Sequence, residues 1–332
     1  MKEYNLKDHG SPWEREWCLT VCKNFINYET FWQKFIAGDL TNRPNNIGLK
    51  NNLDPIIEEM VMSHYSVFIH IAKSHWLFSK YKEESENNDE SKKYLIELYS
   101  DIFFHLGATT EMAERFVFNI WEIGVKIGEI SDLEPIEISD YLLNLFKKYF
   151  NSKNYKKYFD RYLETGQSIS YPLHSIRDIQ NSLGKYLKND QAWGKTINKF
   201  YMISDQKIRR YRNFLTHNPI IGSIKNDDKI YLPKHNKLSD YRYWSSILYK
   251  PESFDHFILV DDLIEKLISD IEKSLDSLWI KLINIMEKFS STSNYMKLIN
   301  VADKEISPIL NQILGDVLVY DSHSFTISTH KM

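Results

Sequence analysis

The sequence has few of the residues that mark disulfide-rich, repetitive or low-complexity proteins. Only two cysteines, Cys18 and Cys22, occur among 332 residues. Their C-x3-C spacing has no further ligands beside it and is poor evidence for zinc, so we predict reduced, structural thiols. The chain has 11 glycines, 9 prolines and no internal repeat, which argues against a low-complexity or repeat protein.

An excess of one charge and long apolar runs are also missing. The formal net charge is −3 and the pI is about 6.4, so any nucleic-acid site must be a local basic patch. The N-terminus lacks the apolar core of a signal peptide, and no later run approaches the roughly 18 apolar residues of a membrane span. We therefore expect a cytoplasmic protein with no membrane partner.

Apolar residues make up 42% of the chain and aromatic residues 14%, which is enough to build a substantial core. Their periodicity is mainly helical, and it is clearest at about 260–289, where apolar residues form one stripe. The segment 218–260 suggests a short hairpin, and the tail near 315–329 alternates as a strand does. We predict an all-α protein with small β additions. The expected helices span about 12–38, 54–80, 92–106, 109–130, 138–150, 155–165, 174–189, 191–216 and 260–289.

The sequence KIRRYRNFLTHNP, residues 207–219, is called the basic segment below. Between residues 193 and 217 six basic residues face one acid, which gives a formal charge of +5. Cations at the C-terminal end of a helix are stabilised by the helix dipole, and this explains Lys207, Arg209 and Arg210. It does not explain a histidine that follows Arg-Asn at a fixed spacing.

Arg212 and His217 would point about 140° apart on an unbroken helix. Pro219 disfavours helical geometry at the residue before it, so we expect the helix to end at or just before His217. The arginine and the histidine could then meet at one cleft. Asn213 lies four residues before His217 and could orient its ring, while Tyr211 and Phe214 could anchor the helix in the core.

The run from Arg212 to His217 resembles the R-N-x-x-x-H form of the R-x4-6-H signature of the HEPN superfamily, a family of helical ribonucleases. The resemblance covers about 54–80 and 172–290. It implies a HEPN-like helical bundle with additional N-terminal helices and a small β hairpin and tail. The corresponding division is an N-terminal helical extension (1–50), a region contributing early bundle helices (51–170), a core with the motif (171–290) and a C-terminal tail (291–332).

This resemblance implies metal-independent cleavage of RNA, without a cofactor, by attack of the ribose 2′-OH on the adjacent phosphate. His217 would act as general acid or base, Arg212 would bind the phosphate, and Asn213 would position either one. Lys207, Arg209 and Arg210 would contact the RNA backbone. One motif copy per chain implies a homodimer, and a toxin or anti-phage effector of this kind would have an antitoxin or an activating partner.

Other polar residues permit alternatives. His64, His70 and His75 lack the spacing of metal ligands on one helix face, so we interpret them as packing residues. Glu58 or Glu59 could supply an acid to the site. His174, Arg177 and Asp178 suggest a polar network at a helix surface.

Three hypotheses remain open from the sequence alone. The first is the ribonuclease, and the second is a non-catalytic HEPN-like module that binds RNA or protein. The third is a helical scaffold in which the motif is accidental.

Overall fold

A computed structural model describes residues 2–3, 21, 23–37, 55–86, 92–131, 176–187, 191–217, 222–224, 229–241, 248–249, 255–295, 318–320 and 327–329. Within these residues the chain is mostly helical with small β additions, which confirms the predicted class. The cysteines and the helices expected at 138–150 and 155–165 lie outside the described residues. The four-part division of the chain stays a prediction.

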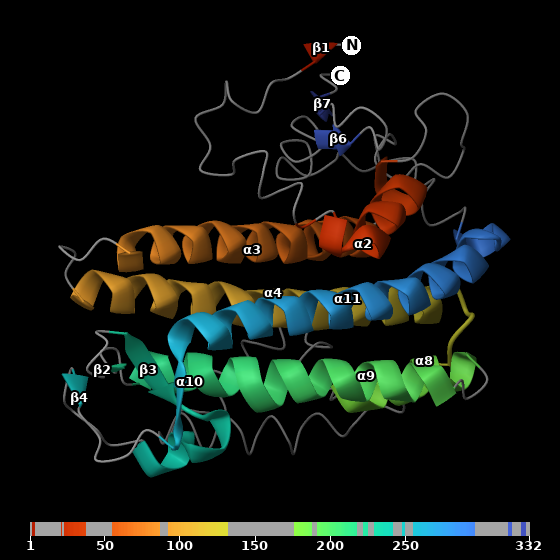
Figure 1. The fold of residues 1–332 in the computed structure, drawn as a ribbon. Coiled ribbons are helices and arrows are strands. Elements are labelled where there is room, and N and C mark those ends of the chain that lie inside the picture. Colours follow the sequence, from red (N-terminus) through yellow and green to blue (C-terminus); the bar gives the residue numbers. More distant parts are fainter. Residues whose placement is uncertain are drawn as a thin grey trace, which may run out of the picture.

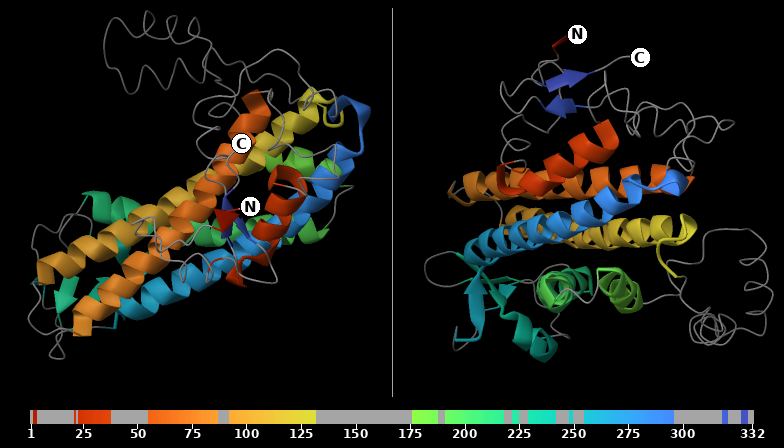
Figure 2. Two further views of the ribbon diagram at one scale, coloured as in Figure 1. Left: turned by 90° about the horizontal axis from the view of Figure 1, so that it is seen from above. Right: turned by 90° about the vertical axis from the view of Figure 1, so that its right-hand side faces the viewer.

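Three layers of helices make up the bundle (Figure 1). The upper layer holds α2 (Ile26–Phe31), which continues into the π-helix η2 (Trp32–Ala37), and α3 (Pro55–Glu86). Beneath it lie α4 (Lys92–Lys126) and α11 (Val260–Ser290). The lower layer contains α8 (Ile176–Tyr186), α9 (Gln191–Ile203) and α10 (Arg209–His217), and Figure 2 shows the same order from the side.

The helix α4 corrects one expectation, because two helices were predicted on either side of Gly107. The structure has a single helix from Lys92 to Lys126. A glycine inside a helix costs only about 1 kcal/mol, which the long contact between α4 and α3 outweighs. The predicted loop at 82–91 is also shorter, since α3 extends to Glu86.

The core joins the upper and middle layers through aromatic rings. His64 on α3 meets Phe116 on α4 edge-on, with ring centroids 5.1 Å apart, and also stacks on Tyr28 at 3.9 Å. Phe25, just before α2, meets Trp279 edge-on, so this part of the N-terminal region belongs to the same hydrophobic cluster. The expectation that His64 is a packing residue is confirmed, and burial lowers its pKa well below the ordinary value.

The helix α11 matches the apolar stripe seen in the sequence. Its buried face includes Leu263, Leu267, Ile271, Leu275 and Leu278. Asp261 and Asp262 occupy its first turn, where carboxylates are favourable toward the helix dipole.

A regular α-helix does not connect α9 to α10. The π-helix η4 (Ser204–Ile208) lies between them and adds a residue to the turn. The helix α9 packs on α11, whereas α10 packs on α4.

Strands form two small sheets. The first comprises β2 (Gly222–Ile224), β3 (Ile230–Pro233), β4 (Leu248–Tyr249) and β5 (Phe257–Leu259), in the order β4-β2-β3-β5. The pair β2 and β3 is the hairpin expected after the basic segment, and the 3-10 helix η5 (His235–Tyr241) follows it. The second comprises β1 (Lys2–Glu3), β6 (Leu318–Tyr320) and β7 (Ile327–Thr329), so the two ends of the chain share one sheet.

Candidate functional site

The helix α10 carries the whole Arg212-to-His217 motif and ends at His217, as expected from Pro219. Tyr211 is buried, and its hydroxyl donates a hydrogen bond to the carbonyl of Pro233 at 3.0 Å. Phe214 is buried as well, so both predicted anchors of the helix are confirmed. The buried face of α10 therefore fixes which way its polar residues point.

Arg212 lies across α4 and pairs with one acid. Its Nη1 donates to Oε1 of Glu111 at 2.6 Å, and the two side chains are 25% and 39% exposed. Arg212 can lie this close to α4 only because residue 107 is glycine, since a Cβ at that position would lie 2.4 Å from Cδ of Arg212. Neither Glu111 nor Gly107 was identified from the sequence, since both lie about a hundred residues from the motif.

The other motif residues are placed less completely. The side chain of Asn213 is exposed and makes no hydrogen bond within the part of the chain that the structure describes. His217 is the last residue of α10, but its side chain lies outside the described residues. By ideal helix geometry Arg212 and His217 leave α10 in directions about 140° apart.

The three cations expected to contact RNA differ in their surroundings. Arg209 pairs with the buried Glu114 and reaches Asp205 at 3.4 Å. Lys207 Nζ lies 3.4 Å from Oδ2 of Asp270 on α11. Arg210 is exposed and has no ion pair among the described residues.

These ion pairs neutralise most of the predicted local charge. Burial raises the pKa of Glu114, and the nearby Arg209 opposes that effect. Burial lowers the pKa of His235 on η5, and the positive charges of Lys207 and Arg210 add to this decrease. Arg210 is therefore the clearest candidate for a contact with an external anion.

The alternative candidates from the sequence fall elsewhere. Glu59 pairs with Arg115. The Nδ1 atoms of His70 and His105 lie 2.9 Å apart, and His75 contacts Glu272. His70 and His75 therefore make polar contacts in addition to packing. The side chains of Glu58, His174, Arg177 and Asp178 lie outside the described residues.

Neither a metal site nor a membrane-spanning helix occurs among the described residues. No group of three or more His, Cys, Asp or Glu side chains there is placed to hold a metal ion. Among the helices of this part of the chain, none combines the length and apolar character needed to cross a bilayer.

Comparisons of the chain with models of protein families, with curated proteins and with solved structures find no match.

Proposed function

We propose that this protein is a metal-independent endoribonuclease of the HEPN type. The observation that carries the proposal is the state of Arg212 at the end of an all-helical bundle. Its guanidinium is partly exposed, held in place by packing against Gly107, and bound by a single carboxylate. A phosphate offers the same paired acceptors with more negative charge, and could replace Glu111 as the partner of Arg212.

The proposed reaction needs a base, an acid and a group that binds the phosphate. The ribose 2′-OH loses its proton to the base, and its oxygen attacks phosphorus. The bond from phosphorus to O5′ breaks, and the acid protonates the leaving oxygen. The products are a 2′,3′-cyclic phosphate and a 5′-OH.

His217 supplies the acid or the base in this scheme, because a histidine with an ordinary pKa near 6.5 can do either near neutral pH. Arg212 stabilises the charge that develops on the phosphate. The 140° divergence of the two residues on α10 favours a composite site, in which each cleft uses motif residues from both copies of a homodimer. Asn213 remains free to bond either the ring or the phosphate.

We propose that Lys207, Arg209 and Arg210 contact the RNA backbone to different extents. Arg210 is exposed and can bind a phosphate directly. Lys207 must first break its single weak ion pair with Asp270. Arg209 is committed to a buried acid, so its first role is to hold α10 on α4. A cytoplasmic toxin or anti-phage effector, restrained by an antitoxin or released by an activating partner, is the setting we propose.

The decisive experiment incubates purified protein with mixed tRNA and mRNA in EDTA and examines the product ends. We expect cyclic phosphate ends from the wild type and no cleavage by Arg212→Ala or His217→Ala. Lys23→Ala, which removes an exposed cation just before α2, is the control and should cleave normally. Cleavage that survives in both motif variants would refute the proposal.

A second function, a non-catalytic module that binds RNA or protein, is favoured by the ion pair between Arg212 and Glu111. This pair occupies the guanidinium that a nuclease needs to stabilise the phosphate, while the exposed Arg210 can still contact a partner. The two functions separate in the same assay, because a binding module shifts RNA in a gel and leaves it uncut.

A further inference from the structure

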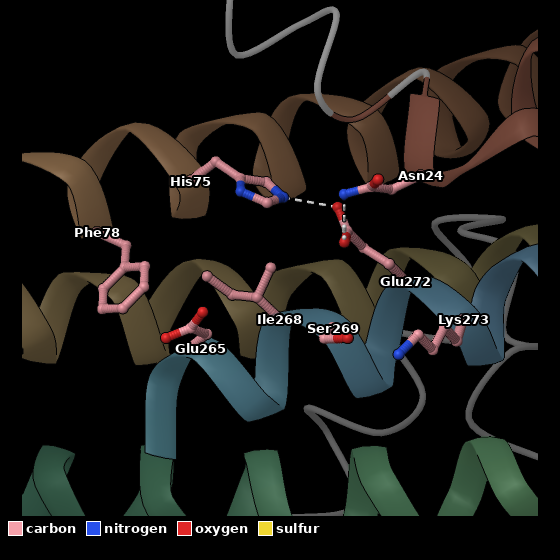
Figure 3. A pocket seen from close by; sticks show the side chains of 8 residues that line it. All are labelled: Asn24, His75, Phe78, Glu265, Ile268, Ser269, Glu272 and Lys273. Atoms are coloured by element: carbon pink, nitrogen blue, oxygen red, sulfur yellow. Dashed lines mark hydrogen bonds and ion pairs between the residues drawn. The ribbon is translucent and has the colours of Figure 1, made fainter. Parts of the chain in front are cut away.

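A cleft of about 320 Å³ opens between α3 and α11, and we call it the α3–α11 cleft (Figure 3). It shares no lining residue with the site around Arg212. Its volume is at the lower end of the range for pockets that hold small molecules. Polar groups lie at both of its ends, with apolar side chains between them.

The inner end is built around the carboxylate of Glu272, whose side chain is only 4% exposed. Its Oε1 accepts a hydrogen bond from Nε2 of His75 at 2.6 Å, and its Oε2 accepts one from the amide of Asn24 at 3.2 Å. Burying a carboxylate without partners is costly, and these bonds from two other segments offset that cost and hold the side chain in one position.

The hydrogen bond to Glu272 also determines which hydrogen bonds the other ring nitrogen of His75 can make. In a neutral ring Nε2 carries the proton, so Nδ1 is left as an acceptor. No described residue donates to it, and in Figure 3 this second nitrogen faces the space between the helices. With the ring in this neutral form, the inner end presents an acceptor beside the Glu272 carboxylate, which suits a donor such as an ammonium group.

The outer end already holds an ammonium group of the protein. Nζ of Lys82 lies 4.5 Å above the ring of Phe78 and 3.6 Å from Oε2 of Glu265. An aromatic face beside a carboxylate is a known way to bind an organic cation. The Lys82 and Glu265 side chains are 46% and 68% exposed, so another amine can replace this contact at small cost.

The two carboxylates are matched in direction. Glu265 and Glu272 are seven residues apart on α11, which places them on nearly the same face with about 10.5 Å of rise between them. Ile268 lies between them in the cleft wall and offers only methyl and methylene groups. A chain of methylenes with a cation at each end complements this pattern.

We propose that the α3–α11 cleft binds a linear organic diamine, one ammonium group at Phe78 and Glu265 and the other at His75 and Glu272. The methylene chain packs on Ile268. Lys273 also lines the cleft, but its side chain is exposed and can turn to solvent when the ligand enters. Lys82 acts as an internal competitor for the outer position.

Calorimetric titration of the full chain, freed of nucleic acid, tests the proposal with 1,8-diaminooctane, whose extended length suits the spacing. We expect saturable binding of one diamine per chain. Binding of 1-aminooctane should be about tenfold weaker, because it lacks the second charged hydrogen bond. Equal affinities for the two compounds, or no saturable heat with the diamine, would overturn the proposal.

Variants locate the ligand. Glu265→Gln should weaken diamine binding about threefold and Glu272→Gln about tenfold, while Lys82→Met should strengthen it about threefold. Glu287→Gln is the matched control, since Glu287 lies on the same helix and pairs with Lys34 instead. Glu265 is exposed, so its substitution leaves the fold intact. Unchanged affinity in both cleft variants would place the diamine elsewhere and refute the site.

Discussion

Glu111 beside α10 and Glu272 in the α3–α11 cleft each meet a basic side chain at 2.6 Å, yet they differ in their access to water. The pair of Glu111 and Arg212 is a quarter to two-fifths exposed, whereas His75 and Glu272 are 13% and 4% exposed. An exposed pair contributes little and exchanges partners readily, but a buried carboxylate depends on its partner. A contact of the same length can thus be an exchangeable ion pair at Arg212 and a fixed structural element in the α3–α11 cleft.

The largest expected effect is on the buried pair. His75→Ala leaves Glu272 buried without its main partner, and we expect the free energy of unfolding to fall by about 3 to 5 kcal/mol. Urea unfolding at pH 7 measures this change. His256→Ala is the control, because His256 is exposed in a turn and its loss should change stability by less than about 0.5 kcal/mol. Equal effects of the two substitutions would contradict the comparison.

Arg209→Met should have the next largest effect, about 3 kcal/mol near neutral pH, because it removes the partner of the buried Glu114. The pKa of Glu114 is already raised by burial, and it rises further without Arg209. An acid whose pKa is higher in the folded state than its ordinary value of 4.5 loses stability as pH rises through that interval. The deficit of the variant should therefore be small at pH 4.5 and grow toward pH 7.5.

Urea unfolding at several pH values measures this dependence. Arg210→Met is the matched control, because Arg210 is exposed and unpaired among the described residues. A deficit in Arg209→Met that did not change with pH would show that lost packing, not the charge of Glu114, is responsible.

Gly107→Ala tests the placement of Arg212 without removing any charge. The added methyl would force Cδ of Arg212 aside, and we expect RNA cleavage to fall by about tenfold to a hundredfold. Stability should change by no more than about 1 kcal/mol, since alanine favours the helix. Gly194→Ala has open space around its new methyl, and its kcat/KM should match the wild type.

Glu111→Gln should produce the smallest change in stability, under about 1 kcal/mol in urea unfolding. Phosphate then no longer competes with a carboxylate for Arg212, so RNA should bind more tightly in a gel shift. Weaker RNA binding would mean that Glu111 positions Arg212 for the phosphate.

Local patterns predicted the helical class and several elements, because they depend on neighbours in the sequence. The apolar stripe of 260–289 became α11 nearly residue for residue, and Pro219 marked the end of α10. Gly107 misled the prediction, since contact with Arg212 and α3 keeps the helix intact there.

Local sequence patterns could not predict which acids pair with the basic residues. Glu111 is 101 residues from Arg212, and Glu272 is 197 residues from His75. Only the packing of α4 on α10 and of α3 on α11 brings them together. A +5 segment therefore looked like a basic patch until its acids were located.

The π-helix η4 also determines which small genetic events the site can tolerate. Its wide turn accommodates one residue more than a regular helix, so deleting one codon within residues 204–208 would restore a regular helix and leave Arg209 and Arg212 facing α4, with α9 still on α11. Deleting one codon inside α10 would instead turn the residues after the deletion by about 100° and move them away from their present partners. The orientation of the motif therefore tolerates the loss of one residue in η4 but not in the helix that carries it.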